Sequence, residues 1–248
     1  MAELVSIAGI GKSFRNGVAA LAGVDLDVTE GEFLSVLGPS GCGKSTLLRI
    51  IAGLMPPSAG KLDWHADGIS GRIGFVFQEP TLMPWAKVWD NVYLPLRLQG
   101  VERDAAAARI GDILAAVGLQ GFEQAYPREL SGGMRMRVSI ARALVTEPRL
   151  LLLDEPFAAL DEITRTKLNE DLLALWRRHR CTVVFVTHSV FESVFLSSRI
   201  VVMGKRPGRV TSEVKVDFSG PRDADLRLSA PYAETCRAVS AQLTRAMT

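Results

Sequence analysis

The sequence predicts an α/β fold built around a sheet of buried parallel strands, and three observations indicate it. Short apolar runs bounded by loops are typical of strands covered on both faces. Helical patterns lie between several of these runs, as parallel connections require. A stretch near the N-terminus instead alternates apolar and polar residues, which indicates an additional antiparallel, half-exposed part.

Length and composition are those of an ordinary globular protein. The chain has 248 residues, of which 48% are hydrophobic and 23% charged, so disordered, fibrous and disulfide-scaffold classes are excluded. Lys and Arg number 29 against 27 Asp and Glu, a formal net charge of +2. This balance favours neither nucleic acid nor an anionic membrane as an electrostatic partner.

The first elements follow from periodicity. Residues 4–10 are predicted to form a strand. Residues 24–29 alternate apolar and polar side chains, as expected for an antiparallel pair. Phe33–Leu37 reads as a buried strand that ends in a glycine cluster. A helix is predicted over 44–54, where the prolines at 56 and 57 stop it.

The remaining elements alternate along the chain. Residues 81–145 lose the strand signal, and the Ala-rich segment 104–117 indicates an inserted helical subdomain, the helical arm. After polar residues 217–229, Tyr232, Cys236, Val239 and Leu243 fall on one helical face, which predicts a docked terminal helix. Further buried strands are predicted at 73–77, 150–153, 183–186 and 200–203.

Cysteine usage and hydropathy bear on location. Cys42, Cys181 and Cys236 are widely spaced, with no C-x-x-C pair, which favours a reducing cytosol over a disulfide framework or a zinc site. No basic, apolar leader opens the sequence, and no stretch approaches the roughly 20 apolar residues of a membrane span. We therefore expect the chain to remain in water.

A phosphate loop follows the strand Phe33–Leu37. The segment matches G-x-x-x-x-G-K-[ST] between a strand and a helix, the context that supports this motif. Glycines let backbone N–H groups turn inward around an anion, Lys44 can reach the β and γ phosphates of ATP, and Ser45 can bind Mg²⁺. The predicted ATP-binding residues of the loop are Gly38, Pro39, Ser40, Gly41, Cys42, Gly43, Lys44, Ser45 and Thr46.

Two adjacent carboxylates end the apolar run at 150–153. Asp154 and Glu155 concentrate negative charge where an apolar strand stops, an arrangement that a cation stabilises. Asp154 is therefore predicted to hold Mg²⁺. Glu155 is predicted to orient or deprotonate the water that attacks the γ-phosphate.

A second glycine-rich helix start, Leu-Ser-Gly-Gly-Met at 130–134, contains no lysine and precedes a helical run to Val145. With the phosphate loop and the carboxylates, this signature segment resembles the ABC transporter ATPases over roughly residues 3–215. The resemblance implies a P-loop NTPase fold with a mixed central sheet, an N-terminal antiparallel β-subdomain and an inserted helical subdomain. The implied ATPase domain is 1–215, with its core at about 1–80 and 146–215 and the helical arm at about 81–145, followed by a tail at 216–248.

The same resemblance implies a head-to-tail dimer of two cassettes. In that family the signature segment of one copy closes over the ATP held by the phosphate loop of the other. Here Ser131, Gly132, Gly133 and Met134 would act in trans on the γ-phosphate. Isolated monomers are then expected to hydrolyse ATP poorly.

Four further positions match functional residues of the family. Gln78 matches the glutamine that senses Mg²⁺ and the attacking water, and His188 matches the histidine that holds the γ-phosphate and positions Glu155. Asp161 matches the aspartate that couples the two sites. Phe14 matches the aromatic residue that stacks on adenine.

Three positions depart from the family pattern. Met134 stands where the signature has Gln, Ala158 where many relatives have Ser, and Ser189 where many have Asp. Because the backbone donors of the signature segment are unchanged, we expect these departures to modulate activity without abolishing it.

Transport requires a partner that spans the membrane. Residues 79–92, which include Trp85, lie where the family receives a helix of its permease, so docking is predicted near Trp85 and the helical arm. The resemblance is to the nitrate, sulfonate and taurine importer branch, served indirectly by a substrate-binding protein. It places the chain peripherally on the cytoplasmic face of a bacterial inner membrane.

Other functions stay open at this point. Residues 187–193 also resemble importers of pyrimidine thiamine precursors or riboflavin. A P-loop kinase would share the phosphate loop but has no use for the signature segment. A non-transport ABC ATPase acting on DNA or ribosomes would share every motif, but usually carries coiled-coil insertions or paired cassettes.

Overall fold

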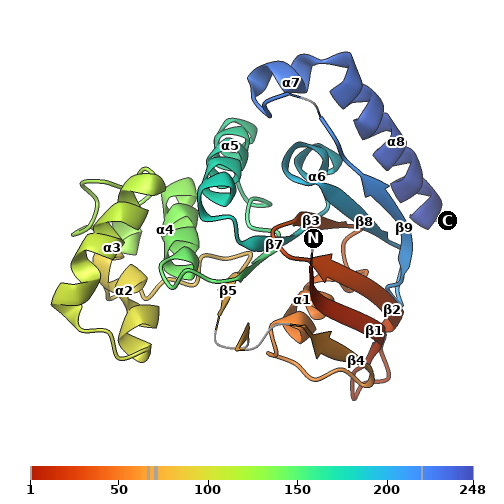
Figure 1. Ribbon diagram of the computed structural model, residues 1–248, viewed down its shortest axis with the longest axis horizontal. Helices are drawn as coiled ribbons and strands as arrows, with labels where there is room; N and C mark the ends of the chain where they lie inside the picture. Colours follow the sequence, from red (N-terminus) through yellow and green to blue (C-terminus); the bar gives the residue numbers. More distant parts are fainter. Residues whose placement is uncertain (1, 66–67, 70–71, 219, 248) are drawn as a thin grey trace. The chain divides into compact units, whose positions relative to one another are not determined.

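The computed structural model describes residues 2–65, 68–69, 72–218 and 220–247. These residues form two compact units, Met1–Gly71 with Thr182–Thr248, and Arg72–Cys181. The predicted α/β class is confirmed, with an antiparallel N-terminal sheet and a separate mixed sheet (Figure 1). The predicted boundaries of the helical arm and of a tail from residue 216 stay predictions.

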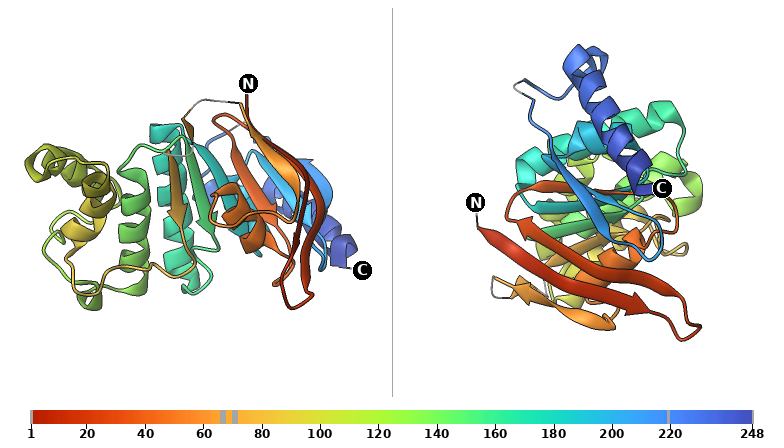
Figure 2. Two further views of the ribbon diagram at one scale, coloured as in Figure 1. Left: turned by 90° about the horizontal axis from the view of Figure 1, so that it is seen from below. Right: turned by 90° about the vertical axis from the view of Figure 1, so that its right-hand side faces the viewer.

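The N-terminal sheet of the first unit has three antiparallel strands in the order β2-β1-β4. They are β1 (Glu3–Ser13), β2 (Ala19–Thr29) and β4 (Ala59–Trp64), seen as long red and orange strands in the right-hand view of Figure 2. In β2 the apolar members of the alternating stretch are buried while Asp25 and Asp27 are exposed, as predicted. The strand β4 is not among the predicted strands, although Leu62 and Trp64 alternate with Lys61 and Asp63 along it.

The mixed sheet of the first unit contains β7 (Thr182–Thr187), β3 (Phe33–Leu37), β8 (Arg199–Met203) and β9 (Val210–Lys215). The strand β3 pairs in parallel with β7 and β8, and β9 pairs antiparallel with β8. Every residue of β3 and β7 is buried, which explains why both read as continuous apolar runs. The strand β9 alternates half-buried and exposed residues and is not among the predicted strands.

Helix α1 (Lys44–Ile51) follows the phosphate loop and is shorter than the predicted 44–54. The prediction of its end is wrong because Gly53 has φ 71° and turns the chain before the prolines are reached. The N–H of Leu54 donates to the carbonyl of Arg49 at 2.9 Å and closes the turn. The C-terminal cap is thus local glycine chemistry rather than proline termination.

Two helices of the first unit cover the mixed sheet on the side away from α1. Helix α6 (Val190–Leu196) packs on β3 and β7, and α8 (Ala230–Met247) packs on α6, β8 and β9 (Figure 1). Short α7 (Ala224–Leu228) precedes α8. Tyr232, Cys236 and Val239 of α8 are buried and Leu243 half-buried, which confirms the predicted docked terminal helix.

The second unit pairs two parallel strands with four helices. Between 77 and 149, where every residue is described, there is no strand, as the sequence predicts. Helix α2 packs against α3 and α4, and these three helices lie together in Figure 1. The elements are β5 (Ile73–Val76), α2 (Val88–Leu98), α3 (Arg103–Ala116), a 3₁₀ turn (Pro127–Glu129), α4 (Gly132–Leu144), β6 (Leu150–Asp154) and α5 (Glu162–His179).

The described chain has neither a helix suited to a membrane nor a disulfide. No helix among these residues has the length and apolar character needed to cross a bilayer. All three cysteines are described, and Cys42, Cys181 and Cys236 are buried without forming disulfides. Burial raises the pKa of the Cys181 thiol to about 11, so that this thiol stays protonated at neutral pH.

Candidate nucleotide site

The phosphate loop joins β3 to α1 in the first unit. Gly41 and Gly43 have φ of 77° and 103°, a region that side chains disfavour, so the turn depends on glycine. Gly43 caps α1 without a side-chain hydrogen bond, and the following backbone N–H groups open the helix. Lys44 is 3% exposed, and its Nζ donates to the carbonyls of Gly38 at 2.8 Å and Pro39 at 3.0 Å. The ammonium group therefore lies inside the loop.

Residues 204–209, which are distant in sequence, pack against the phosphate loop. A Cβ on Gly208 would lie 2.0 Å from the carbonyl oxygen of Cys42, so only glycine fits there. The N–H of Gly208 donates to Ala20 at 2.8 Å, and Arg206 Nε donates to the carbonyl of Gly41 at 3.2 Å. Sequence reasoning did not find this supporting role, since a Pro-Gly pair by itself indicates only a turn.

His188 lies at the same sheet edge as the phosphate loop. It follows Thr187, which pairs with Leu37 in the parallel ladder of β7 and β3. Gly38 follows Leu37, so the histidine and the loop leave neighbouring strands at their carboxyl ends, where α/β proteins bind ligands. The side chain of His188 is exposed.

Ser189, one of the departures from the family pattern, caps helix α6. Its Oγ accepts a hydrogen bond from the N–H of Glu192 at 3.3 Å, and its own N–H donates to Thr187 Oγ1 at 3.0 Å. A serine in this position therefore supplies a normal helix cap next to His188.

Phe14 lies in an open hollow of the first unit, lined also by Lys12, Arg15 and Met55. The ring is 38% exposed, and the Lys12 ammonium lies 5.9 Å from its centre. An aromatic face left open in this way can stack on a planar base. The geometry is compatible with the predicted adenine contact.

The two carboxylates of the second unit lie at the end of β6. Asp154 is its last residue and is 4% exposed. Glu155 adopts φ 45°, a conformation rare for a residue with a side chain and concentrated at functional sites. The strand β5 pairs in parallel with β6, and Gln78 lies just beyond β5, exposed at the edge where Asp154 ends its strand.

The signature segment forms the start of α4. Ser131 is the N-cap, and its Oγ accepts a hydrogen bond from the N–H of Met134 at 3.2 Å. Gly133 is buried, and a Cβ there would lie 2.7 Å from the Cγ2 methyl of Thr164 on α5. Met134 takes part in the cap through its backbone, so the missing Gln side chain leaves this part of the segment intact.

Asp161 caps α5 in the same way. Its Oδ1 accepts a hydrogen bond from the N–H of Thr164 at 3.0 Å, and this bond holds the pKa of the Asp161 carboxyl below its usual value. Ala158 is half-buried in the turn after Glu155, where its N–H donates to the Glu155 carbonyl at 3.2 Å. Asp161 thus has a local structural role in addition to the predicted coupling role.

Two residues that sequence reasoning did not single out hold the loop after Gln78. Arg142 of α4 donates to the carbonyls of Pro80 at 2.9 Å and Thr81 at 3.0 Å. Asn91 of α2 is fully buried, and it accepts a hydrogen bond from the N–H of Met83 at 2.8 Å. Its Nδ2 lies within hydrogen-bond distance of three carbonyls, those of Met83, Ala86 and Lys87. The loop is therefore tied to the helix that begins with the signature segment.

The two tryptophans of this region differ in exposure. Trp85 lies in the anchored loop between β5 and α2 and is 77% exposed. Trp89 instead packs in the helical arm, 5.0 Å from the ring of Tyr93, with the Arg103 guanidinium 3.9 Å from its own ring. Of the two tryptophans in the predicted docking cluster, Trp85 is thus the one exposed to a partner.

Comparison with known proteins identifies a family and several relatives of this chain. A family model described as ABC transporter matches residues 21–158. The chain is 51% identical over 84% of its length, and 79% of the relative's, to "Uncharacterized ABC transporter ATP-binding protein MJ0412" of Methanocaldococcus jannaschii. It is 49% identical over 84% of both chains to "Aliphatic sulfonates import ATP-binding protein SsuB 1" of Pseudomonas savastanoi pv. phaseolicola.

A solved structure shares the fold. It is titled "Dimeric structure of a post-hydrolysis state of the ATP-binding cassette MJ0796 bound to ADP and Pi". It matches with TM-score 0.76 and 34% identity, covering 87% of this chain and 100% of that chain. The chain belongs to the ABC transporter family. Within that family it is an ATP-binding subunit, the ATPase of a transporter, which confirms the resemblance found from the motifs.

Proposed function

We propose that this chain hydrolyses ATP to drive uptake of an aliphatic sulfonate or a related small solute through a separate membrane permease. The observation that carries the proposal is the presence, in one chain, of a phosphate loop and a second glycine-rich helix start at 130–134. The solute class is supported by the 49% identical relative named for aliphatic sulfonate import.

ATP binding is assigned first to the phosphate loop, residues 38–46. Its backbone N–H groups and Lys44 would hold the phosphates, while the open ring of Phe14 would stack on adenine. The support at Gly208 keeps the loop in shape before nucleotide arrives. A preformed anion site of this kind costs little reorganisation on binding.

Mg²⁺ is assigned to Ser45, Gln78 and Asp154. A hydroxyl, an amide oxygen and a carboxylate are the hard oxygen donors that this ion prefers. Asp154 is the last residue of the strand β6, so its carboxylate is placed on a rigid element that can present it as one of these donors. When bound, the ion neutralises charge on the phosphate oxygens.

Hydrolysis is assigned to Glu155, which would accept a proton from the attacking water, with His188 positioning the γ-phosphate. The composite site requires a second copy of the chain, whose signature segment, Ser131 to Met134, would complete it. Asp161 would couple the two sites of the dimer. Loss of one such donor to the developing charge typically lowers the rate about 10² to 10³-fold.

The permease is proposed to dock at Trp85 on the loop held by Asn91 and Arg142. Because Arg142 belongs to α4, movement of this helix on closure over ATP would reach the docking loop directly. The chain would then sit peripherally on the cytoplasmic face of the membrane. A substrate-binding protein would deliver the solute on the opposite side.

The dimer is tested with Glu155→Gln, which should bind ATP without hydrolysing it. On size-exclusion chromatography with ATP we expect a dimer for this variant. Lys44→Ala, which weakens phosphate binding, serves as the control and should elute as a monomer. A Glu155→Gln chain that binds ATP normally yet stays monomeric would contradict the composite site.

The cargo is tested separately, in liposomes that contain the chain with its co-purified permease and binding protein. ATP-dependent uptake of ethanesulfonate is expected, and it should be lost with Glu155→Gln. Uptake of riboflavin or a thiamine precursor instead of ethanesulfonate would overturn the solute assignment but not the dimer.

A further inference from the structure

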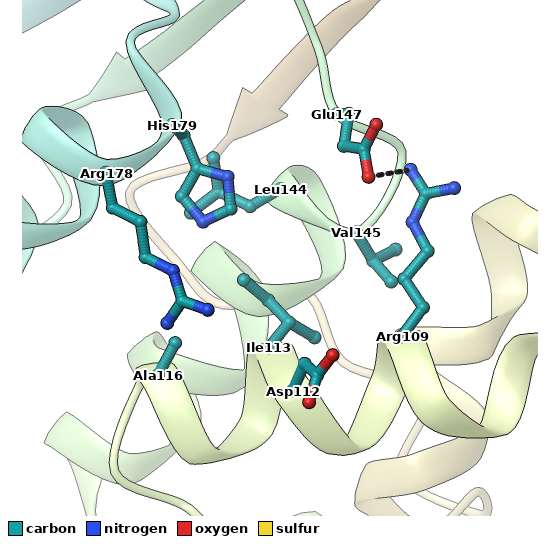
Figure 3. Close-up of a pocket in the computed structure, with 9 residues that line it drawn as sticks. All are labelled: Arg109, Asp112, Ile113, Ala116, Leu144, Val145, Glu147, Arg178 and His179. Carbon is teal, nitrogen blue, oxygen red and sulfur yellow. Dashed lines mark ion pairs between the residues drawn. The ribbon is translucent and has the colours of Figure 1, made fainter.

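The second unit contains a cavity that has no part in the nucleotide site. It has a volume of about 160 Å³ and lies between α3, the C-terminal end of α4 and the C-terminal end of α5 (Figure 3). None of the residues assigned to ATP, Mg²⁺ or the signature segment lines it. Four of its nine lining residues are charged, and three of these, Asp112, Glu147 and Arg178, are exposed to solvent.

One side of the cavity is basic. Arg178 and His179, from the last turn of α5, extend their side chains toward it in Figure 3. The Nε2 atom of His179 is buried and has no hydrogen-bond partner. Within the described chain, Arg178 forms no ion pair. Basic residues near a helix C-terminus complement its dipole, but that role leaves the hydrogen-bonding groups of these two side chains unused.

The other side is acidic. Asp112 of α3 lines the cavity, and in the described part of the structure it has no ion-pair partner. Glu147 also lines it and lies 3.4 Å from an amino group of Arg109, the pair joined by a dashed line in Figure 3. Glu147 adopts φ 49° in the turn after α4. The cavity thus presents one carboxylate without a partner and one that already has a cation.

The charges of the lining cancel. Two arginines oppose two carboxylates, Arg109 and Arg178 against Asp112 and Glu147. Burial, followed by the charge of Arg178, lowers the pKa of His179, so the imidazole is neutral at pH 7. A simple anion or a simple cation therefore gains attraction on one side and meets repulsion on the other. A ligand that carries both charges avoids this conflict.

The floor of the cavity is apolar, formed by Ile113 and Leu144 among others. A cavity of about 150 Å³ can hold a molecule the size of benzene, so a space of about 160 Å³ is large enough for a small organic molecule. Such a space takes a short molecule with charged ends and a two- or three-carbon middle. The apolar floor would contact that middle part.

We propose that this cavity binds a small zwitterion, with its acid group at Arg178 and His179 and its ammonium group at Asp112. Carboxylate and sulfonate zwitterions share this chemistry. Charge-assisted hydrogen bonds at both ends would supply the affinity and the selectivity against ligands that carry one charge. The imidazole nitrogen that now lacks a partner would gain one.

The test is calorimetric titration of the full chain without nucleotide. The probes are taurine and β-alanine, which are zwitterions with sulfonate or carboxylate, and the single-charge analogues ethanesulfonate, propionate and ethylamine. For ligands of this size we expect dissociation constants of about 1 mM for the better zwitterion. The analogues are expected to bind at least about tenfold more weakly.

Two variants and one control locate the binding. Arg178→Gln and Asp112→Asn should each weaken zwitterion binding about tenfold or more. Arg177→Gln alters an exposed arginine in the same turn that does not line the cavity, so it should leave binding unchanged. Thermal melting of all three proteins establishes that they are folded.

Each other result overturns the proposal. If none of the probes binds, the cavity is not a ligand site of this class. If ethanesulfonate or propionate binds as tightly as the zwitterions, the cavity recognises an acid group alone. If binding survives in both Arg178→Gln and Asp112→Asn, the zwitterion binds elsewhere.

Discussion

The close approach of Gly133 to α5 makes a sharp prediction about the signature segment. In Gly133→Ala the added Cβ would lie 2.7 Å from the Cγ2 methyl of Thr164, nearer than carbon atoms approach without displacement. Turning the Thr164 side chain away would break the hydrogen bond between its hydroxyl group and the Asp161 carboxylate. The start of α4 must therefore shift.

The size of the effect follows from two opposing contributions. Overpacking of this kind lowers the free energy of unfolding by about 1–3 kcal/mol. Alanine in place of glycine in a helix raises it by up to about 1 kcal/mol. We expect Gly133→Ala to lower the free energy of unfolding by about 1 kcal/mol. Since the shift moves the signature segment, ATPase activity should fall about tenfold or more.

The contact is isolated by a second substitution. Thr164→Ser removes only the methyl that obstructs the new Cβ and keeps the backbone bond to Asp161. The parent, the two single variants and the double variant form a double-mutant cycle, in which urea unfolding and ATP turnover are measured for each protein. A coupling of about 1–2 kcal/mol in stability and recovery of activity in the double variant are expected.

Gly111→Ala is the matched control, because a Cβ at this position in α3 meets no atom within 4 Å. It should stabilise the chain by about 0.5–1 kcal/mol and leave turnover unchanged. Should Gly133→Ala prove as stable and active as the parent, or should Thr164→Ser fail to rescue it, the contact does not control the signature segment.

Three further predictions rest on single contacts. Asn91→Ala leaves buried groups of the docking loop without partners, and urea unfolding should show a loss of about 2–3 kcal/mol. Gly208→Ala would place its Cβ 2.0 Å from the Cys42 carbonyl, so titration with a fluorescent ATP analogue should show at least about tenfold weaker binding, unlike Gly220→Ala, whose Cβ meets nothing within 4 Å. The pKa of the Asp161 carboxyl is lower in the folded chain than its unfolded value of 3.8, so the ionised carboxylate stabilises the fold above pH 3.8. This stabilisation is lost as the pH falls through the folded pKa. In unfolding measurements below about pH 4, the difference in free energy of unfolding between the parent and Asp161→Asn should therefore shrink. If that difference does not change with pH, the ionised carboxylate does not stabilise the fold.

Much of the fold could be predicted because its signals are local. The strands β3 and β7 are covered on both faces, so their residues are apolar without interruption and stand out in the sequence. The strands β4 and β9 contain exposed positions and polar residues, so neither shows the continuous apolar run that identifies β3 and β7. They become strands because a neighbour offers hydrogen bonds.

The candidate site divides in the same way. Lys44, Asp154 and the signature segment belong to short contiguous motifs, whose residue types reflect the chemistry of phosphate and metal. Arg142 donates to a carbonyl group 62 residues away, and such a bond leaves no local pattern. The carbonyl groups that Asn91 bonds are only four to eight residues away, but the fold of the loop is what brings them within reach of its side chain.

The order of residues along the chain was sufficient to establish an ATP-binding cassette, since phosphate binding uses a few backbone amides and side chains that are neighbours in sequence. Folding was needed to show that Gly208 lies against the phosphate loop, that Gly133 leaves no space beside Thr164, and that the basic end of α5 shares a cavity with Asp112. These arrangements depend on tertiary contacts between segments that are far apart in the sequence. Close packing between residues far apart in sequence is a property of the assembled core, and no short segment records it.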